Sequence, residues 1–289
     1  MMQVANTAVV KSGYAPVNGL KIYYKIYEPE TTDETRNARI HGAGVPLLAL
    51  HGGLGSTEMF GPILPLLGNR RVIAVDLQGH GCTADIDRPI RYEAMGDDIF
   101  GLMKYLGIEK ADILGYSLGG GTGLRTAIQH PEVVRKLVSV SAVFARDGWY
   151  TDILAQMSQM GPALAEQMKP SPIYKAYSRS APRPADWPVL VTKVGDLLRK
   201  HYDWSKDVAA MKTPTMLVFG DADSIRPAHE VEFFQLLGGG QKDPGWDGSG
   251  MPNARLAILP AATHYNMLES PLLAPAVRSF LDAPMPAAR

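Results

Sequence analysis

The sequence of 289 residues predicts an α/β fold built on a mostly parallel, doubly wound sheet. Short apolar runs alternate along the chain with longer stretches that have the apolar spacing of helices. The runs are nearly continuous in Val, Ile, Leu and Ala, as expected for parallel strands covered by helices on both faces. Hydrophobic residues make up 46% of the chain, which is enough for a large core. We therefore expect one domain over residues 1–289.

The elements follow in chain order. An antiparallel hairpin is predicted over 13–28, because Asn18-Gly19 is a strong hairpin-turn signal, and a polar loop over 31–44 follows it. Buried strands are predicted at 45–50, 72–75, 111–114, 137–143, 216–219 and 256–259. Helices are predicted at 92–106, 118–129 and 227–237, the last with a proline in its first turn and Gly238 just beyond its end. The glycine-rich stretch 238–250 is expected to be a surface loop.

Residues 145–213 interrupt this alternation and are rich in aromatic residues, methionine and proline. We expect a mostly helical insertion that lies as a lid over the carboxyl edge of the sheet, where ligands bind in such folds. Most of its large side chains should pack the insertion onto the core, and a minority should face an apolar substrate pocket.

Composition excludes several classes of protein. The 29 basic residues balance the 29 acidic residues, which argues against nucleic acid as a partner. Cys82 is the only cysteine, so an intramolecular disulfide is excluded. The chain has no apolar run of ~18 residues and no signal-peptide pattern, so we expect no membrane span and a cytoplasmic location.

A nucleophile elbow is the strongest chemical signal. The motif Gly115-Tyr116-Ser117-Leu118-Gly119 follows an apolar strand and precedes a helical stretch. A tight turn there would raise the Ser117 hydroxyl onto an exposed tip, at a helix N-terminus that favours negative charge. The two glycines lack a Cβ and allow the neighbouring backbone to approach closely.

A serine nucleophile needs a base, and the base needs an orienting acid. His264 follows the last predicted strand and is the candidate base. Asp221 and Asp223 follow the preceding strand, and Asp147 follows the strand before that. The order Ser, Asp, His along the chain is the order expected for an elbow of this kind.

Four segments of the chain, spread over most of its length, carry a family resemblance. They are His51-Gly52-Gly53-Leu54-Gly55-Ser56, Asp76-Leu77-Gln78-Gly79-His80-Gly81, the Ser117 elbow, and the stretches around Asp223 and His264. With these motifs the chain resembles the serine hydrolases of the α/β-hydrolase fold. The resemblance implies that Asp223, in Gly-x-x-Asp-x-x-x-Pro, is the acid, with Asp221 as the alternative. It also implies that the backbone N–H groups of Gly53 and Leu118 form an oxyanion hole.

Other residues near these motifs have structural interpretations. His51 and His80 are expected to support loops, Asp76 to fix a turn by hydrogen bonding, and Cys82 to pack. No metal or cofactor is expected, because the chain lacks metal-ligand spacing such as His-Glu-x-x-His, a Walker lysine and a Rossmann glycine motif after the first strand.

The resemblance and the triad together predict a hydrolase that cleaves a small apolar carboxylic ester or lactone through an acyl-enzyme on Ser117. A carbon–carbon bond hydrolase, a thioesterase or an amidase would use the same residues. A cofactor-free perhydrolase is a further alternative, although those enzymes usually carry a tryptophan where Gly53 stands. A ligand receptor that has kept the fold is the non-enzymatic alternative.

Overall fold

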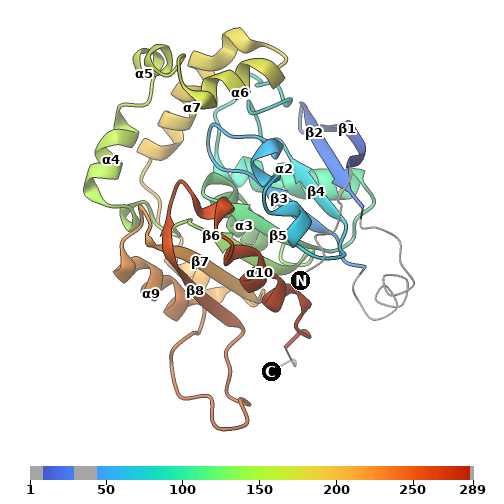
Figure 1. The fold of residues 1–289 in the computed structure, drawn as a ribbon, viewed down its shortest axis with the longest axis vertical. Coiled ribbons are helices and arrows are strands. Elements are labelled where there is room, and N and C mark those ends of the chain that lie inside the picture. Colours follow the sequence, from blue (N-terminus) through green and yellow to red (C-terminus); the bar gives the residue numbers. More distant parts are fainter. Residues whose placement is uncertain (1–8, 29–43, 287–289) are drawn as a thin grey trace.

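Eight strands form one sheet across the middle of the molecule. The computed structural model describes residues 9–28 and 44–286, and within them the strand order is β1-β2-β4-β3-β5-β6-β7-β8 (Figure 1). The strands are β1 Val9–Val17, β2 Leu20–Tyr27, β3 Leu47–Leu50, β4 Val72–Val75, β5 Ala111–Tyr116, β6 Val134–Val140, β7 Thr215–Ala222 and β8 Ala254–Thr263. All pairs from β4 to β8 are parallel, whereas β2 pairs antiparallel with β1 and with β4. The predicted mostly parallel sheet is confirmed.

The N-terminal hairpin is also confirmed. Asn18 and Gly19 connect β1 and β2, and their φ angles are 49° and 84°. Two successive residues with positive φ match the right-handed twist of the strands that they join, which is why Asn-Gly is favoured at this place. The predicted polar loop over 31–44 lies outside the described residues except for Gly44.

Helices cover both faces of the sheet. Those outside the 145–213 segment, among residues 9–28 and 44–286, are α2 Tyr92–Tyr105, α3 Leu118–Gln129, α9 Pro227–Leu236 and α10 Leu273–Asp282. Side chains alternate along each strand, so Leu48 and Leu50 of β3 pack in a core with α2, α3 and α9, while Leu47 and Ala49 pack in a second core with α10. Burial on both faces explains why β3 and β4 are apolar throughout.

The strand predicted at 137–143 is displaced, because β6 runs from Val134 to Val140. The prediction from apolar residues left out two charged residues that lie in the strand and are hydrogen-bonded there. Lys136 is only 1% exposed and donates to the Phe280 and Leu281 carbonyls at the end of α10, at 2.8 and 3.3 Å. Arg135 donates to Asp112 of β5 at 2.7 Å. The strand ends at Val140, and Ser141, which follows it, has a φ of 50°.

The segment 145–213 is mostly helical, as predicted. It contains α4 Thr151–Ser158, α5 Pro162–Gln167, α6 Pro172–Ser180, α7 Trp187–Arg199 and α8 Ser205–Ala210, with short 3₁₀ turns at Arg146–Gly148 and Pro184–Asp186. Helices α5, α6 and α7 lie together at the top of Figure 1. Trp187 is 1% exposed, donates to the Ala165 carbonyl at 2.8 Å and packs against Tyr174 and Tyr177. Tyr177 and Trp187 belong to the same core as Leu48 and Leu50, and Tyr174 packs against it, so these aromatic side chains extend the core of the sheet into the helical segment.

Two further findings bear on the predictions made from the sequence. The stretch 238–250 is mostly exposed, with Trp246 fully so. Among the described helices, none is both long and apolar enough to cross a membrane.

Candidate active site

Ser117 stands on a sharp turn between β5 and α3. Its backbone has φ 52° and ψ −114°, a region that non-glycine residues rarely occupy and that costs about 1–3 kcal/mol. A Cβ on Gly115 would lie 2.1 Å from the Gly119 carbonyl oxygen, and a Cβ on Gly119 would lie 2.0 Å from that of Leu50. The strained turn therefore requires glycine at both places.

The structure brings Ser117, His264 and Asp223 together at the carboxyl edge of the sheet. His264 follows β8, and its Nε2 lies 3.1 Å from Ser117 Oγ. Asp223 follows β7, and its Oδ1 lies 2.9 Å from His264 Nδ1. The side chains of His264 and Asp223 are 11% and 0% exposed. These contacts orient the imidazole with its Nδ1–H toward the carboxylate and its Nε2 toward the hydroxyl.

Asp223 is held as a carboxylate by donors on both of its oxygens. Besides His264, Oδ1 accepts from the Ser224 N–H at 2.8 Å. Oδ2 accepts from Ser141 Oγ at 2.6 Å and from the Gly220 N–H at 3.2 Å. Burial acts to raise the pKa of Asp223. The hydrogen bond from His264, the charge of His264 and the hydrogen bond from Ser141 together outweigh burial, so the pKa of Asp223 is below its usual value. The group is therefore an anion at neutral pH.

The two alternative acids lie elsewhere. The sequence predicted that Asp221 follows the strand, but the structure places it inside β7, where its side chain is exposed. Asp147 is exposed in the 3₁₀ turn after β6, where its carbonyl accepts from Arg226 Nε at 3.0 Å. His264 Nδ1 is directed to Asp223 instead.

Gly53 and Leu118 adjoin one another beside Ser117. Leu118 is the first residue of α3, and Gly53 follows β3 by three residues. A Cβ built on Gly53 would lie 3.9 Å from Leu118 Cβ, and one built on Gly52 would lie 3.5 Å from Ser117 Cβ. The loop after β3 thus faces the nucleophile turn.

Buried histidines support that loop. His51 Nε2 accepts from the Leu77 N–H at 3.1 Å, and its Nδ1 lies 2.7 Å from the Gly52 carbonyl. His80 Nδ1 lies 2.8 Å from the Gln78 carbonyl, and its ring packs against His51 at 5.1 Å. Burial lowers the pKa of His51 to about 4 and that of His80 to about 3, so both are neutral at pH 7.

Asp76 ties the same region together. Its oxygens accept from the Thr57 N–H at 2.7 Å and from the Cys82 N–H at 2.8 Å, and burial raises its pKa to about 6. These contacts agree with the prediction that Asp76 fixes a turn by hydrogen bonding.

Sequence reasoning missed three residues around His264. Ser141 donates to Asp223, the Tyr116 hydroxyl donates to the His264 carbonyl, and the Trp149 ring meets the imidazole edge-on at 5.3 Å. Only the position of Ser141 could have indicated its contact with Asp223, because Ser141 directly follows β6, which is the neighbour of β7 in the sheet.

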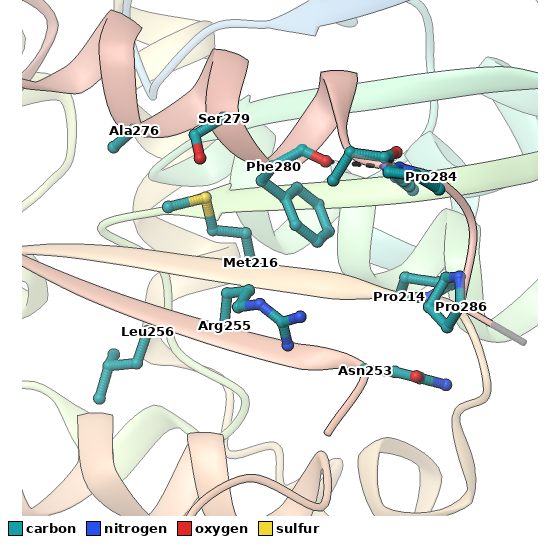
Figure 2. A pocket seen from close by; sticks show the side chains of 12 residues that line it. Pro214, Met216, Asn253, Arg255, Leu256, Ala276, Ser279, Phe280, Pro284 and Pro286 are labelled. Atoms are coloured by element: carbon teal, nitrogen blue, oxygen red, sulfur yellow. Dashed lines mark hydrogen bonds between the residues drawn. The ribbon is translucent and has the colours of Figure 1, made fainter. Parts of the chain in front are cut away.

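A cavity of about 330 Å³ lies at the opposite edge of the sheet (Figure 2). It is lined by the first residues of β7 and β8 and by α10, including Pro214, Met216, Arg255 and Phe280. Because parallel strands place their ligand sites at the carboxyl edge, this cavity is separate from the Ser117 site. Within 9–28 and 44–286, no group of three or more His, Cys, Asp or Glu side chains is arranged to hold a metal.

Comparison with known proteins points to the same fold. Residues 45–271 match the family model of the alpha/beta hydrolase fold. A 2-(acetamidomethylene)succinate hydrolase from Mesorhizobium japonicum is 27% identical over 86% of this chain and 92% of its own length. A 2-hydroxymuconate semialdehyde hydrolase from Pseudomonas sp. is 39% identical, over 35% of this chain and 38% of its own length. The chain matches only about a third of the length of the curated relatives that are 37% and 39% identical to it.

The solved structure of an enol-lactonase from Burkholderia xenovorans superimposes with a TM-score of 0.66 and 21% identity, covering 93% of this chain and all of that one. Such a low identity shows the shared fold alone. The family match covers most of the chain and agrees with the sheet order and the elbow. The chain therefore belongs to the α/β-hydrolase-fold family of hydrolases.

Proposed function

We propose that the protein is a serine hydrolase that cleaves a small carboxylic ester or lactone through an acyl-enzyme on Ser117. The observation that carries the proposal is the continuous contact from Ser117 Oγ through His264 to Asp223, at 3.1 and 2.9 Å. A nucleophile, a base and an orienting acid in this arrangement are what acyl transfer needs.

In the first half-reaction His264 Nε2 takes the Ser117 proton as the oxygen attacks the substrate carbonyl carbon. The carbonyl oxygen becomes negative and is stabilised by the N–H groups of Gly53 and Leu118, as well as by the N-terminus of α3. The intermediate collapses when the bond to the leaving alcohol breaks, and the imidazolium returns the proton to that alcohol.

In the second half-reaction a water molecule gives its proton to His264 and attacks the acyl carbon. The bond to Ser117 Oγ then breaks, and His264 returns the proton to the serine. Asp223 stays ionised throughout and stabilises the imidazolium that forms in each half.

The surroundings favour an apolar substrate. Trp149 lies against His264, and a Cβ on Gly53 would lie 3.8 Å from Val194 Cγ1 of α7. Helix α7 therefore passes close to the proposed oxyanion donors. We propose that the 145–213 segment is a lid and that these apolar side chains form part of the substrate wall.

A second candidate is a carbon–carbon bond hydrolase with the same triad. The 39% identity to a 2-hydroxymuconate semialdehyde hydrolase favours it. Parallel assays with p-nitrophenyl esters, γ-lactones and 2-hydroxymuconate semialdehyde separate the two, because the enzyme should turn over its own substrate class fastest.

Labelling with a fluorophosphonate tests the nucleophile. We expect covalent modification at Ser117 and a burst of p-nitrophenol from p-nitrophenyl butyrate. Ser117→Ala should lose both, with kcat lower by about 10³-fold or more. Ser158→Ala, at an exposed serine of α4, is the matched control and should keep both. Equal turnover by Ser117→Ala would refute the mechanism, and ligand-induced thermal stabilisation without turnover would point to a receptor.

A further inference from the structure

Lys193 connects the helical segment to the body of the protein. It lies on α7, and its ammonium donates to Asp85 Oδ2 at 2.6 Å, to the Ile86 carbonyl at 2.7 Å and to the Arg88 carbonyl at 2.9 Å. All three donors of the ammonium are used. The side chains of Lys193 and Asp85 are only 20% and 9% exposed, so this pair is shielded from solvent more than an ordinary surface ion pair.

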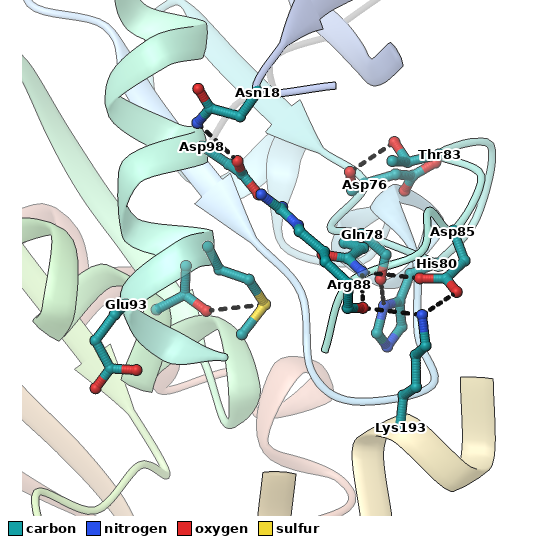
Figure 3. A network of polar contacts seen from close by, with 12 residues as sticks. Asn18, Asp76, Gln78, His80, Thr83, Asp85, Arg88, Glu93, Asp98 and Lys193 are labelled. Atoms are coloured by element: carbon teal, nitrogen blue, oxygen red, sulfur yellow. Dashed lines mark hydrogen bonds and ion pairs between the residues drawn. The ribbon is translucent and has the colours of Figure 1, made fainter. Parts of the chain in front are cut away.

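The acceptors of Lys193 all belong to the segment between β4 and α2, and further bonds brace that segment (Figure 3). Gln78 donates to Asp85 Oδ1 at 2.8 Å and to the Arg88 carbonyl at 3.1 Å, while Arg88 Nε donates to Gln78 Oε1 at 2.7 Å. Arg88 also pairs with Asp98 of α2. The Lys193 contact therefore enters a rigid network and not a free loop.

The network continues to the loop that carries Gly53. The Gln78 carbonyl is bonded to His80, whose ring packs on His51, and His51 accepts from the Leu77 N–H. His51 stands two residues before Gly53. The path from Lys193 to this loop thus consists of hydrogen bonds and one ring contact, joined through the Gln78 residue itself, and its groups are buried or half-buried.

Helix α7 also contacts both the Gly53 loop and the segment between β4 and α2 through apolar side chains. Val194, next to Lys193, is 2% exposed and lies near Gly53, and Leu190 Cδ1 would lie 3.2 Å from a Cβ on Gly79. The position of α7 therefore bears on Gly53 both through apolar contact and through the polar network.

We propose that Lys193 and Asp85 form a latch that fixes α7 against the Gly53 loop and thereby sets the position of the Gly53 N–H. Both are positioning residues, since neither touches the reacting atoms. The proposal rests on the proposed function in so far as that N–H stabilises the oxyanion. A group that aligns an oxyanion donor acts on the transition state, so its loss should appear in kcat and not in KM.

Two variants test the latch. Lys193→Met removes the ammonium and keeps the apolar stem, and Asp85→Asn removes one charge with little change in size. Asp196→Asn is the control on the same helix, because Asp196 pairs with Arg199 in an exposed (i, i+3) ion pair. The rate of amide hydrogen exchange in the peptide 50–60 measures whether the Gly53 loop is held in place. Fluorophosphonate labelling of the protein without substitutions tests the proposed function separately.

We expect exchange in 50–60 to become about tenfold faster in Lys193→Met and to stay unchanged in Asp196→Asn. With p-nitrophenyl butyrate, kcat should fall about tenfold with KM within about twofold, and the double variant should lose little more than either single one. Unchanged exchange in 50–60, or a loss confined to KM, would overturn the latch. If the unmodified protein is not labelled, the proposed function fails, and the exchange result still decides whether the latch exists.

Discussion

Replacement of Asp223 by asparagine keeps the size of the side chain and exchanges one acceptor oxygen for an NH₂ group. In the structure each oxygen of Asp223 faces a backbone donor, the Ser224 N–H at 2.8 Å and the Gly220 N–H at 3.2 Å. An asparagine has one acceptor oxygen, so either orientation of its amide turns an NH₂ group toward a backbone N–H. The change leaves one buried donor unsatisfied, at a cost of about 1–3 kcal/mol in stability.

The effect on activity should be larger than the effect on stability. If the NH₂ group faces His264, the imidazole must present a lone pair at Nδ1 and carry its proton at Nε2. It then cannot accept the Ser117 proton. The equivalent change in a serine protease triad lowers kcat about 10⁴-fold, which corresponds to ~5 kcal/mol in the activation barrier. We expect a fall of this order for Asp223→Asn.

Initial rates with p-nitrophenyl butyrate measure the change, and thermal melts confirm that the variant is folded. Asp221→Asn is the matched control, because Asp221 is exposed in the same strand end, and its kcat should stay within about twofold of the original. A loss of less than about tenfold in Asp223→Asn, or an equal loss in both variants, would refute the assignment of Asp223 as the orienting acid.

Two further variants test the supports of the site. Burial lowers the pKa of His80 to about 3 in the folded protein, whereas the unfolded value is ~6.5. As the pH falls below ~6.5, His80 takes up a proton in the unfolded chain but not in the folded one. The free energy of unfolding therefore falls by ~1.4 kcal/mol by pH ~5.5. His80→Phe should therefore lose less melting temperature between about pH 7.5 and 5.5 than the original chain; an equal loss would contradict this. Gly119→Ala should destabilise by more than about 3 kcal/mol in urea titrations, because its Cβ would lie 2.0 Å from the Leu50 carbonyl. Gly161→Ala, with nothing within 4 Å of the added Cβ, should cost only about 1 kcal/mol for the poorer N-cap of α5, and similar losses in both variants would show that the turn tolerates a side chain.

The sequence allowed good prediction where local pattern and tertiary packing agree. The helix predicted over 118–129 is α3 with the same bounds, because the elbow fixes its start and its apolar face packs on the sheet. The hairpin turn at Asn18-Gly19 was predictable for a similar reason, since the turn chemistry is encoded in two adjacent residues.

Prediction was poorer where distant parts of the chain decide the outcome. The start of β6 was missed because Arg135 and Lys136 are tolerated there only through Asp112 and the carbonyls of α10. Strand β8 was predicted to end at Leu259, before Pro260, but runs to Thr263 with Ala261 at a φ of 56°. The choice between Asp221 and Asp223 could be made from the family motif, whereas the Ser141 contact depends on which strands are neighbours.

The buried ammonium of Lys136 has a consequence for the order of events during synthesis. Its partners at Phe280 and Leu281 are 144 and 145 residues further along the chain. While the ribosome is still adding those residues, the middle of the sheet holds a cation without its acceptors, and burying it then would be unfavourable. The second core, which α10 closes, can therefore be completed only after α10 has been synthesised, so Lys136 can be buried only when the residues of that helix are present.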